Sequence, residues 1–154
     1  MKNGIALLLT GLLMYGCAVK KTLETTAPFQ LGEPFGQKWV VEEDPNTKGY
    51  DVILPILSLN KNDAVLHNLY HHGEMIPVTI EMREIGMVAV AKFPSKEGPK
   101  IDQLSDGEAF PFVLGEAEAV LSYVQKKKVR YIKVNGIRQN PTIAYPSLVA
   151  RRNN

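Results

Sequence analysis

The chain begins with an uncharged apolar run that is too short to cross a membrane as a helix. The run covers residues 4–15 (GIALLLTGLLMY) and follows a short segment with one positive side chain, Lys2. Twelve helical residues span about 18 Å, well short of the ~30 Å hydrocarbon core of a bilayer. This length is typical of the apolar region of a signal peptide. We therefore expect residues 1–16 to be removed and to take no part in the fold.

The end of this run, Met14-Tyr15-Gly16-Cys17, resembles the lipobox of bacterial lipoproteins. The resemblance implies cleavage before Cys17, a diacylglyceryl group on its sulfur and acylation of its new amino group. We expect no other cofactor than this covalent lipid. The alternative is an ordinary signal peptide, or an N-terminal anchor, that happens to contain a cysteine. Cys17 is the only cysteine in the chain, which excludes an internal disulfide and any CxxC-type metal or redox site.

The residue after the cysteine bears on sorting. In the Gram-negative lipoproteins that this segment resembles, an Asp directly after the acylated cysteine is a signal for retention in the inner membrane. This chain has Ala18 at that position. The resemblance thus implies a protein that is lipid-anchored in the outer membrane, on its periplasmic face. In a Gram-positive host this sorting rule does not apply.

The composition indicates one ordinary globular domain plus some extra chain, with 45% hydrophobic and 22% charged residues. A net charge of +2 gives no argument for binding nucleic acid. Residues 17–37 mix Thr, Pro, Gly and charge without a period, which predicts an acylated N-terminus and a flexible tether. We expect a single folded domain over residues 38–150 and a basic tail over residues 151–154.

The residue patterns predict an α+β domain with a small, mostly antiparallel sheet of about six strands. Residues 76–83 alternate apolar and polar side chains, and residues 87–93 are a nearly all-apolar run of strand length. Residues 129–134 also predict a strand. Residues 50–59 also predict a strand, at an edge or with a bulge, because the run contains a proline. Asn135-Gly136 indicates a tight hairpin turn.

Two segments predict helices. The main one, residues 116–127, has acidic residues in its first turn, basic residues in its last and apolar residues at i, i+3, i+4 and i+7. Those apolar residues are Ala117, Val120, Leu121 and Val124. The short one, residues 63–72, has Asn62 as its cap and Gly73 as its stop. Its buried side would consist of Val65, Leu66, Leu69 and Tyr70.

All three histidines fall within six residues, at His67, His71 and His72. On the predicted short helix, His67 and His71 would lie one turn apart on one face. That spacing can hold Zn²⁺ or Cu²⁺ with Glu74 as a third ligand. The alternative is that the histidines lie on the solvent side of the helix and bind no metal.

The charges are distributed unevenly along the chain. No acidic residue follows Glu118, whereas the same stretch contains eight lysine and arginine residues. We expect a basic binding surface made of Lys126, Lys127, Lys128, Arg130, Lys133 and Arg138. Such a surface could meet anionic lipid, an acidic protein partner or transported nucleic acid. The alternative is that the fold interleaves these residues with the acidic ones.

These features favour a binding protein over an enzyme. Ser58 and Lys61 match an S-x-x-K motif, but the chain lacks the S-D-N and K-T-G partner motifs. Our first hypothesis is an accessory or structural subunit of an envelope assembly, such as a secretion, conjugation or surface-organelle complex. It would be held to the membrane by its acyl chains and would dock a protein partner by a strand edge or its basic face. The alternatives are a periplasmic metal- or small-ligand-binding lipoprotein that uses the histidines and, third, an envelope hydrolase.

Overall fold

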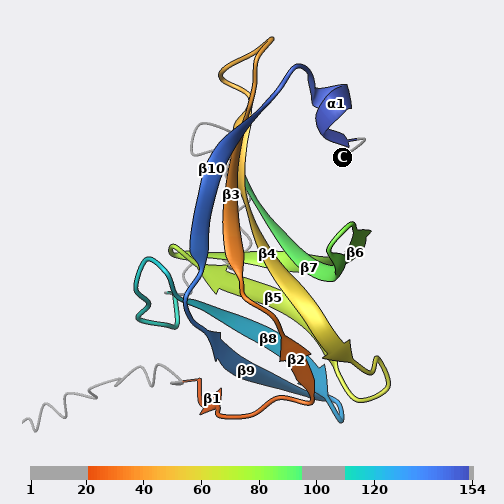
Figure 1. Cartoon of the computed structure of the whole chain (residues 1–154). Coiled ribbons are helices and arrows are strands. Elements are labelled where there is room, and N and C mark those ends of the chain that lie inside the picture. Colours follow the sequence, from red (N-terminus) through yellow and green to blue (C-terminus); the bar gives the residue numbers. More distant parts are fainter. Residues whose placement is uncertain (1–20, 95–109, 153–154) are drawn as a thin grey trace, which may run out of the picture.

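The computed structural model describes residues 21–94 and 110–152, and most of them form β-strands (Figure 1). The prediction of an α+β domain is therefore wrong, because this part of the chain is mostly β and its one helix has five residues. In chain order the elements are β1 (Leu23–Glu24), β2 (Phe29–Leu31), β3 (Phe35–Val41), β4 (Lys48–Leu59), β5 (Val65–His71), β6 (Glu74–Arg83), β7 (Gly86–Pro94), β8 (Ala119–Gln125), β9 (Lys128–Val134), β10 (Arg138–Tyr145) and α1 (Leu148–Arg152). No helix in the described ranges is long and apolar enough to cross a membrane.

The strands form one mixed sheet in the order β1-β9-β8-β5-β6-β7-β4-β3-β10, with β2 paired to β4 beside this path. Neighbouring strands are antiparallel, except that β1 runs parallel to β9 and β10 runs parallel to β3. The pairing of β10 with β3 shows that Asn135-Gly136 does not close a hairpin. The chain passes through this turn, where Gly136 has a φ of 71°, and crosses to the other end of the sheet.

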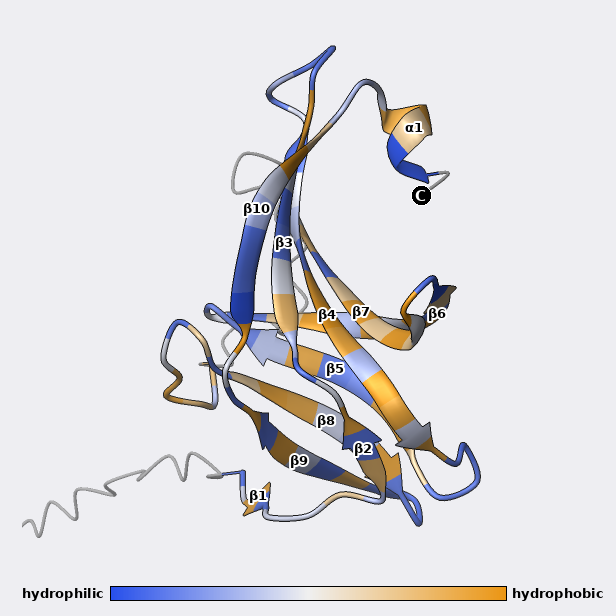
Figure 2. Ribbon diagram, viewed as in Figure 1, coloured by the Kyte–Doolittle hydropathy of each residue, from blue (hydrophilic) through white to orange (hydrophobic). Residues whose placement is uncertain are grey.

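The sheet bends at β6, which changes partners along its length. Residues 74–77 pair with β5 and residues 78–83 pair with β7. The bend divides the sheet into a lower half (β1, β9, β8 and β5) and an upper half (β7, β4, β3 and β10), which pack face to face (Figure 1). Apolar residues concentrate along β4, β7 and β8 between the halves (Figure 2). The fully buried core residues include Val52, Leu54, Ala89 and Ala91 of the upper half and Leu69 and Leu121 of the lower half.

Pro55 lies inside a central strand rather than in an edge strand. On one side β4 pairs with β7 throughout this region. On the other side β3 pairs as far as Ile53 and β2 begins at Ile56, so Pro55 lies between two partners. Its carbonyl accepts a hydrogen bond of 2.8 Å from the amide of Gly32. The missing N–H of proline therefore costs no ladder hydrogen bond.

The predicted short helix over residues 63–72 is the strand β5 with a bulge. Leu66 pairs with Tyr123 and Leu69 pairs with Leu121, so His67 and Asn68 together lie opposite Ser122. The extra residue places Leu66 and Leu69 on the same buried face although they are three positions apart. A helix produces the same spacing, which is why the pattern predicted one.

The predicted main helix over residues 116–127 is a turn followed by β8. This strand is covered on both faces, and its first five residues are all buried. A run of consecutive apolar residues can match helical positions without being helical. The lysines expected at the end of the helix form a two-residue hairpin turn, with φ values of 49° at Lys126 and 63° at Lys127. Positive φ at both central positions is the signature of a type I′ turn.

The folded domain begins before Lys38. Within the segment expected to be a flexible tether, β1 and β2 are paired strands, and β3 begins at Phe35. Phe29 is buried, and its ring meets the ring of Tyr123 edge-on with centroids 5.0 Å apart. The rest of the expected tether, residues 17–20, lies outside the described residues.

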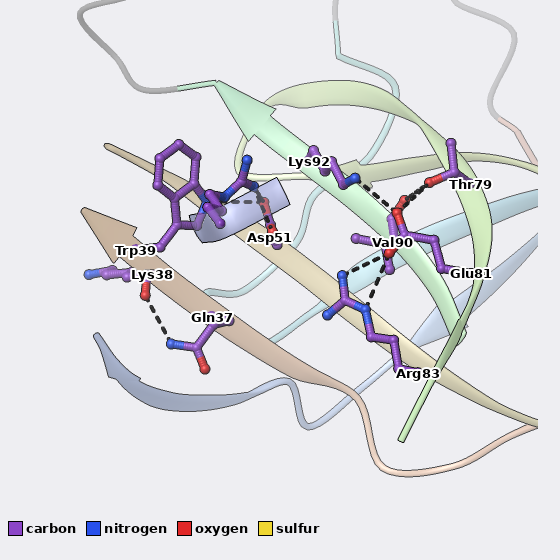
Figure 3. Close-up of polar contacts among 10 residues, drawn as sticks. Gln37, Lys38, Trp39, Asp51, Thr79, Glu81, Arg83, Val90 and Lys92 are labelled. Carbon is purple, nitrogen blue, oxygen red and sulfur yellow. Dashed lines mark hydrogen bonds and ion pairs between the residues drawn. The ribbon is translucent and has the colours of Figure 1, made fainter. Parts of the chain in front are cut away.

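The helix α1 is attached to the upper half through Arg151. Its guanidinium bonds both carboxylate oxygens of Asp51, at 3.0 and 3.2 Å, and lies 3.7 Å from the ring centroid of Trp39. The indole of Trp39 donates to the same carboxylate (Figure 3). Part of the expected basic tail is thus packed against the sheet, whereas Arg152 is exposed. Residues 153–154 lie outside the described residues.

The bulge in β5 depends on the hydroxyl of Ser122, which accepts from the amide of Asn68 at 3.0 Å and donates to its carbonyl at 3.2 Å. Changing Ser122→Ala leaves both backbone groups without this partner, and we expect a loss of about 1–3 kcal/mol in the free energy of unfolding. Urea titration of the purified domain measures this loss. The exposed Ser58→Ala is the control and should stay within about 0.5 kcal/mol of wild type. An equal effect of both changes would contradict the role of the hydroxyl.

Candidate functional site

The structure does not form the histidine clamp that the sequence predicted. His67 is exposed at the bulge, and its ring contacts the side-chain amide of Asn68 at 3.3 Å. His71 is fully buried, four residues further along an extended strand, a distance of about 13 Å. Glu74 lies opposite His71 across the β5–β6 hairpin. Among the described residues, no three His, Cys, Asp or Glu side chains form a group that could hold a metal ion.

Half of the predicted basic surface is paired with acidic residues. Arg130 pairs with Glu24 of β1, and Arg138 lies 3.9 Å from Glu33. Lys133 pairs with Glu118 at 2.7 Å. The fold therefore interleaves these cations with the acidic part of the chain.

The other three cations, Lys126, Lys127 and Lys128, gather at the tip of the β8–β9 hairpin. All three are exposed, and none forms an ion pair with another described residue. Of the six predicted binding residues, only these three remain as a cluster of uncompensated charge.

A large cavity lined by described residues lies at the seam between the two halves of the sheet. Its volume is about 620 Å³, a size typical of sites that hold a small molecule or a few side chains. The lining comes from β3, β4, the β5–β6 hairpin, β7, the turn before β8 and the start of β10. The lining residues are Lys38, Tyr50, His72, Glu74, Phe93, Glu116, Ala117, Ile137 and Gln139.

A chain of hydrogen bonds fixes the wall of this cavity. The amide of Gln139 donates to the hydroxyl of Tyr50 at 2.8 Å, and this hydroxyl lies 3.5 Å from Nε2 of His71. On its other side, Nδ1 of His71 lies 2.8 Å from the carbonyl of Glu118. A carbonyl only accepts, so Nδ1 of His71 is the donor and its Nε2 is free to accept from Tyr50. Four segments of the chain are thereby joined at one point.

The buried imidazole of His71 is held in its neutral form. Burial lowers its pKa below the usual value, with a smaller opposing effect from the Glu118 carbonyl and a further lowering from His72. The rings of His71 and His72 stack, with centroids 3.7 Å apart. His72 in turn contacts the carbonyl of Glu116 at 3.2 Å and places its exposed ring in the cavity wall.

Three charged side chains line the cavity without a salt bridge to any described residue. They are Lys38, Glu74 and Glu116. The apolar surface is supplied by Phe93 and Ile137. The cavity thus combines an apolar wall with free charges of both signs, and it can bind a group that is partly apolar and carries a charge or hydrogen-bonding atoms.

Of the cavity residues, Glu74 and His72 were predicted only as members of a metal-binding cluster, and Lys38, Tyr50, Glu116 and Gln139 were not predicted as site residues. These residues lie far apart in the chain and only the topology brings them together. One signal was available at Gly36, the second residue of β3. A Cβ at this position would collide with the hydroxyl of Tyr50. A glycine inside a strand often marks such a close approach of another group.

The neutral His71 makes stability depend on pH. Because its folded pKa lies below its unfolded value of 6.5, only the unfolded chain gains a proton as the pH first falls below 6.5. We expect the free energy of unfolding to decrease there, by up to about 1.4 kcal/mol per pH unit. Urea titrations at pH 7.5, 6.5 and 5.5 measure this slope. The slope should disappear in His71→Asn and persist in the exposed control His67→Asn. A slope that His71→Asn retains would contradict the assignment.

No protein-family model, curated protein or solved structure matches this chain. Its function is therefore inferred from the chemistry of its own surfaces.

Proposed function

We propose that this protein is a lipid-anchored binding protein of the bacterial cell envelope. It is an accessory subunit that holds a segment of a partner protein in the cavity at the seam of the sheet. The anchor rests on the resemblance of residues 14–17 to a lipobox. The binding role rests on one observation, the cavity of about 620 Å³ in which Lys38, Glu74 and Glu116 have no charged partner among the described residues.

The exposed edge of β10 is a less suitable binding site for a partner protein than the cavity is. This edge contains Pro141, which has no N–H to donate to an added strand. Its pairing with β3 also shifts register between Asn140 and Ile143. Prolines and irregularities of this kind protect sheet edges from pairing with other chains. Docking by strand addition therefore has no regular ladder to extend at β10.

Unlike the edge of β10, the cavity offers a preformed wall with polar, charged and apolar groups. Its hydrogen-bonded wall, formed by Gln139, Tyr50 and His71, is fixed before any ligand arrives, which reduces the entropy lost on binding. Glu74 and Glu116 fit a basic group of the partner, and Phe93 and Ile137 fit its apolar part. The hydroxyl of Tyr50 is already bonded to Gln139 and faces His71. These contacts favour binding over catalysis.

The anchor is tested by metabolic labelling with an alkyne palmitate. We expect the full-length protein to carry the label and to fractionate with the outer membrane, and Cys17→Ser to lose both properties. Labelling of Cys17→Ser equal to that of the wild type would contradict the lipoprotein assignment. The control is Thr22→Ser, a change five residues after the acylated Cys17, and this variant should label normally.

The cavity is tested by a photo-reactive phenylalanine in the full-length protein in its host. We expect one discrete protein adduct from position 139, which lines the cavity, and none from position 142, which is equally exposed on β10 but lies away from it. Glu74→Gln combined with Glu116→Gln should remove the adduct at position 139, because both charges that attract a basic group are lost.

The two positions give the experiment its control, because they share one strand and only position 139 lines the cavity. Equal adducts at positions 139 and 142, or an adduct that the double glutamine change leaves intact, would contradict a partner in the cavity. No protein adduct, together with a small molecule that co-purifies and is seen by native mass spectrometry, would favour the small-ligand alternative instead.

A further inference from the structure

The outer face of the lower half carries a cluster of aromatic rings. Strand residues alternate between faces, so Tyr70 and Tyr131 point away from the core into which Leu69 and Ile132 point. Residues 110–114 (FPFVL) lie over this face. The ring of Phe112 is 5.0 Å from that of Tyr70 and 5.7 Å from that of Tyr131. Phe110 lies 6.1 Å from Tyr70.

This covering segment leaves apolar side chains in contact with solvent. Val113 is fully exposed, with a relative accessibility of 101%, and Val129 of the neighbouring β9 is 51% exposed. Leu23 of β1, which pairs with Tyr131, adds an exposed apolar side chain at the edge of the same face. Exposed apolar side chains that gather on one face mark a surface that meets a partner or a membrane.

Lys21, the first described residue, lies on this same face. Its ammonium is 5.1 Å from the ring centroid of Tyr131 and 5.6 Å from that of Tyr70, within the range of cation–π contacts. The chain therefore enters the domain through the aromatic cluster.

The position of Lys21 limits where the bilayer can be, provided that the proposed lipidation of Cys17 holds. Four peptide steps separate Cys17 from Lys21 and reach at most about 14 Å when fully extended. A domain of this length is about 35 Å across. The membrane must therefore lie on the side of the domain that carries Lys21, because the opposite side is out of reach.

The charges next to this face have the sign that an anionic bilayer attracts. Lys126, Lys127 and Lys128 extend from the hairpin that ends β8 and begins β9, the strand that carries Val129 and Tyr131. Each lysine near an anionic surface strengthens binding by roughly fivefold. Tyrosine rings beside lysines are also the residue types enriched at membrane–water interfaces.

We propose that the outer face of the lower half, made of Lys21, Leu23, Phe110, Phe112, Val113, Val129 and Tyr131 with the lysines of the β8–β9 hairpin beside it, lies against the surface of the anchoring membrane. Its partner is a lipid bilayer with anionic headgroups. This orientation rests on the proposed lipidation, because the short link from the acylated Cys17 holds this face close to the membrane. The residues of the face then add their own contacts with the lipid.

Depth-dependent quenching of tryptophan fluorescence tests this orientation. The lipidated full-length protein is reconstituted in phosphatidylethanolamine–phosphatidylglycerol vesicles with brominated acyl chains. Trp39 is the only tryptophan and lies in the upper half, so the wild type supplies the background. We expect strong quenching of the emission that Val113→Trp adds. The emission that Met82→Trp adds, at an equally apolar and 76% exposed site of β6, should stay unquenched.

The charge contribution is measured with non-acylated protein of the processed length, residues 17–154 with Cys17→Ser, on vesicles with and without phosphatidylglycerol. Lys126→Asn with Lys127→Gly removes two charges while suiting the type I′ turn, so the hairpin should remain folded. We expect affinity for the anionic vesicles to fall by tenfold or more and affinity for neutral vesicles to stay unchanged.

The outcomes separate this inference from the proposed function. Absence of palmitate on Cys17 overturns the anchor and, with it, the orientation. Palmitoylated protein in which Val113→Trp is quenched no more than Met82→Trp overturns the orientation alone. A photo-reactive group at position 113 that captures a protein rather than lipid in cells also overturns it, because the face would then be a protein interface.

Discussion

The change of partner along β6 is the constraint on which the rest of the structure depends. A strand that pairs with β5 over residues 74–77 and with β7 over residues 78–83 forces the sheet to turn where the pairing changes. Pro77 is the last residue paired with β5, and a proline at such a junction needs no donor for a continuing ladder. The turn brings the inner faces of the two halves together. Without it the apolar residues of β4 and β8 would have no surface to cover them.

The same bend creates the seam in which the cavity lies. His71 comes from the lower half, Tyr50 from the upper half and the Glu118 carbonyl from the turn before β8. Their hydrogen bonds replace the backbone ladder that the two halves cannot form with each other. A buried imidazole suits this position because it can donate through one nitrogen and accept through the other. The cost is the loss of its charged form, which the lowered pKa of His71 records.

The sequence was informative over β6, β7 and β9 and misleading over β5 and β8. The alternation over residues 76–83 predicted β6, and the predicted strands at residues 87–93 and 129–134 are confirmed as β7 and β9. By contrast, both faces of β8 are covered, by the core on one side and by residues 110–114 on the other. Its side chains therefore show no alternation. The bulge in β5 then produced helical spacing in a strand, and a bulge stabilised by Ser122, far along the chain, leaves no local signal.

The candidate surfaces could be predicted only in part, for a related reason. A run of lysines at residues 126–128 is visible in the sequence, but the acidic partners of Arg130 and Lys133 come from β1 and from the turn before β8. The order of the strands decides which cations have no acidic partner. This order includes two parallel pairings between strands far apart in the sequence, β1 with β9 and β3 with β10. The cavity residues likewise come from segments that meet only after the sheet has closed.

Strand β8 relates the two proposed surfaces to each other. It begins two residues after Ala117, which lines the cavity, and ends at the lysine hairpin, so its seven residues separate the two by about 20 Å. In the proposed orientation the outer face of this strand and its neighbours is turned to the bilayer, and the seam opens at the other end of the strand. Docking at the cavity and contact with the membrane therefore use different atoms. A rigid sheet between them holds the cavity at a fixed height and direction above the membrane. This placement favours capture of a partner that is itself bound to the envelope, because the protein and its partner then move over the same surface.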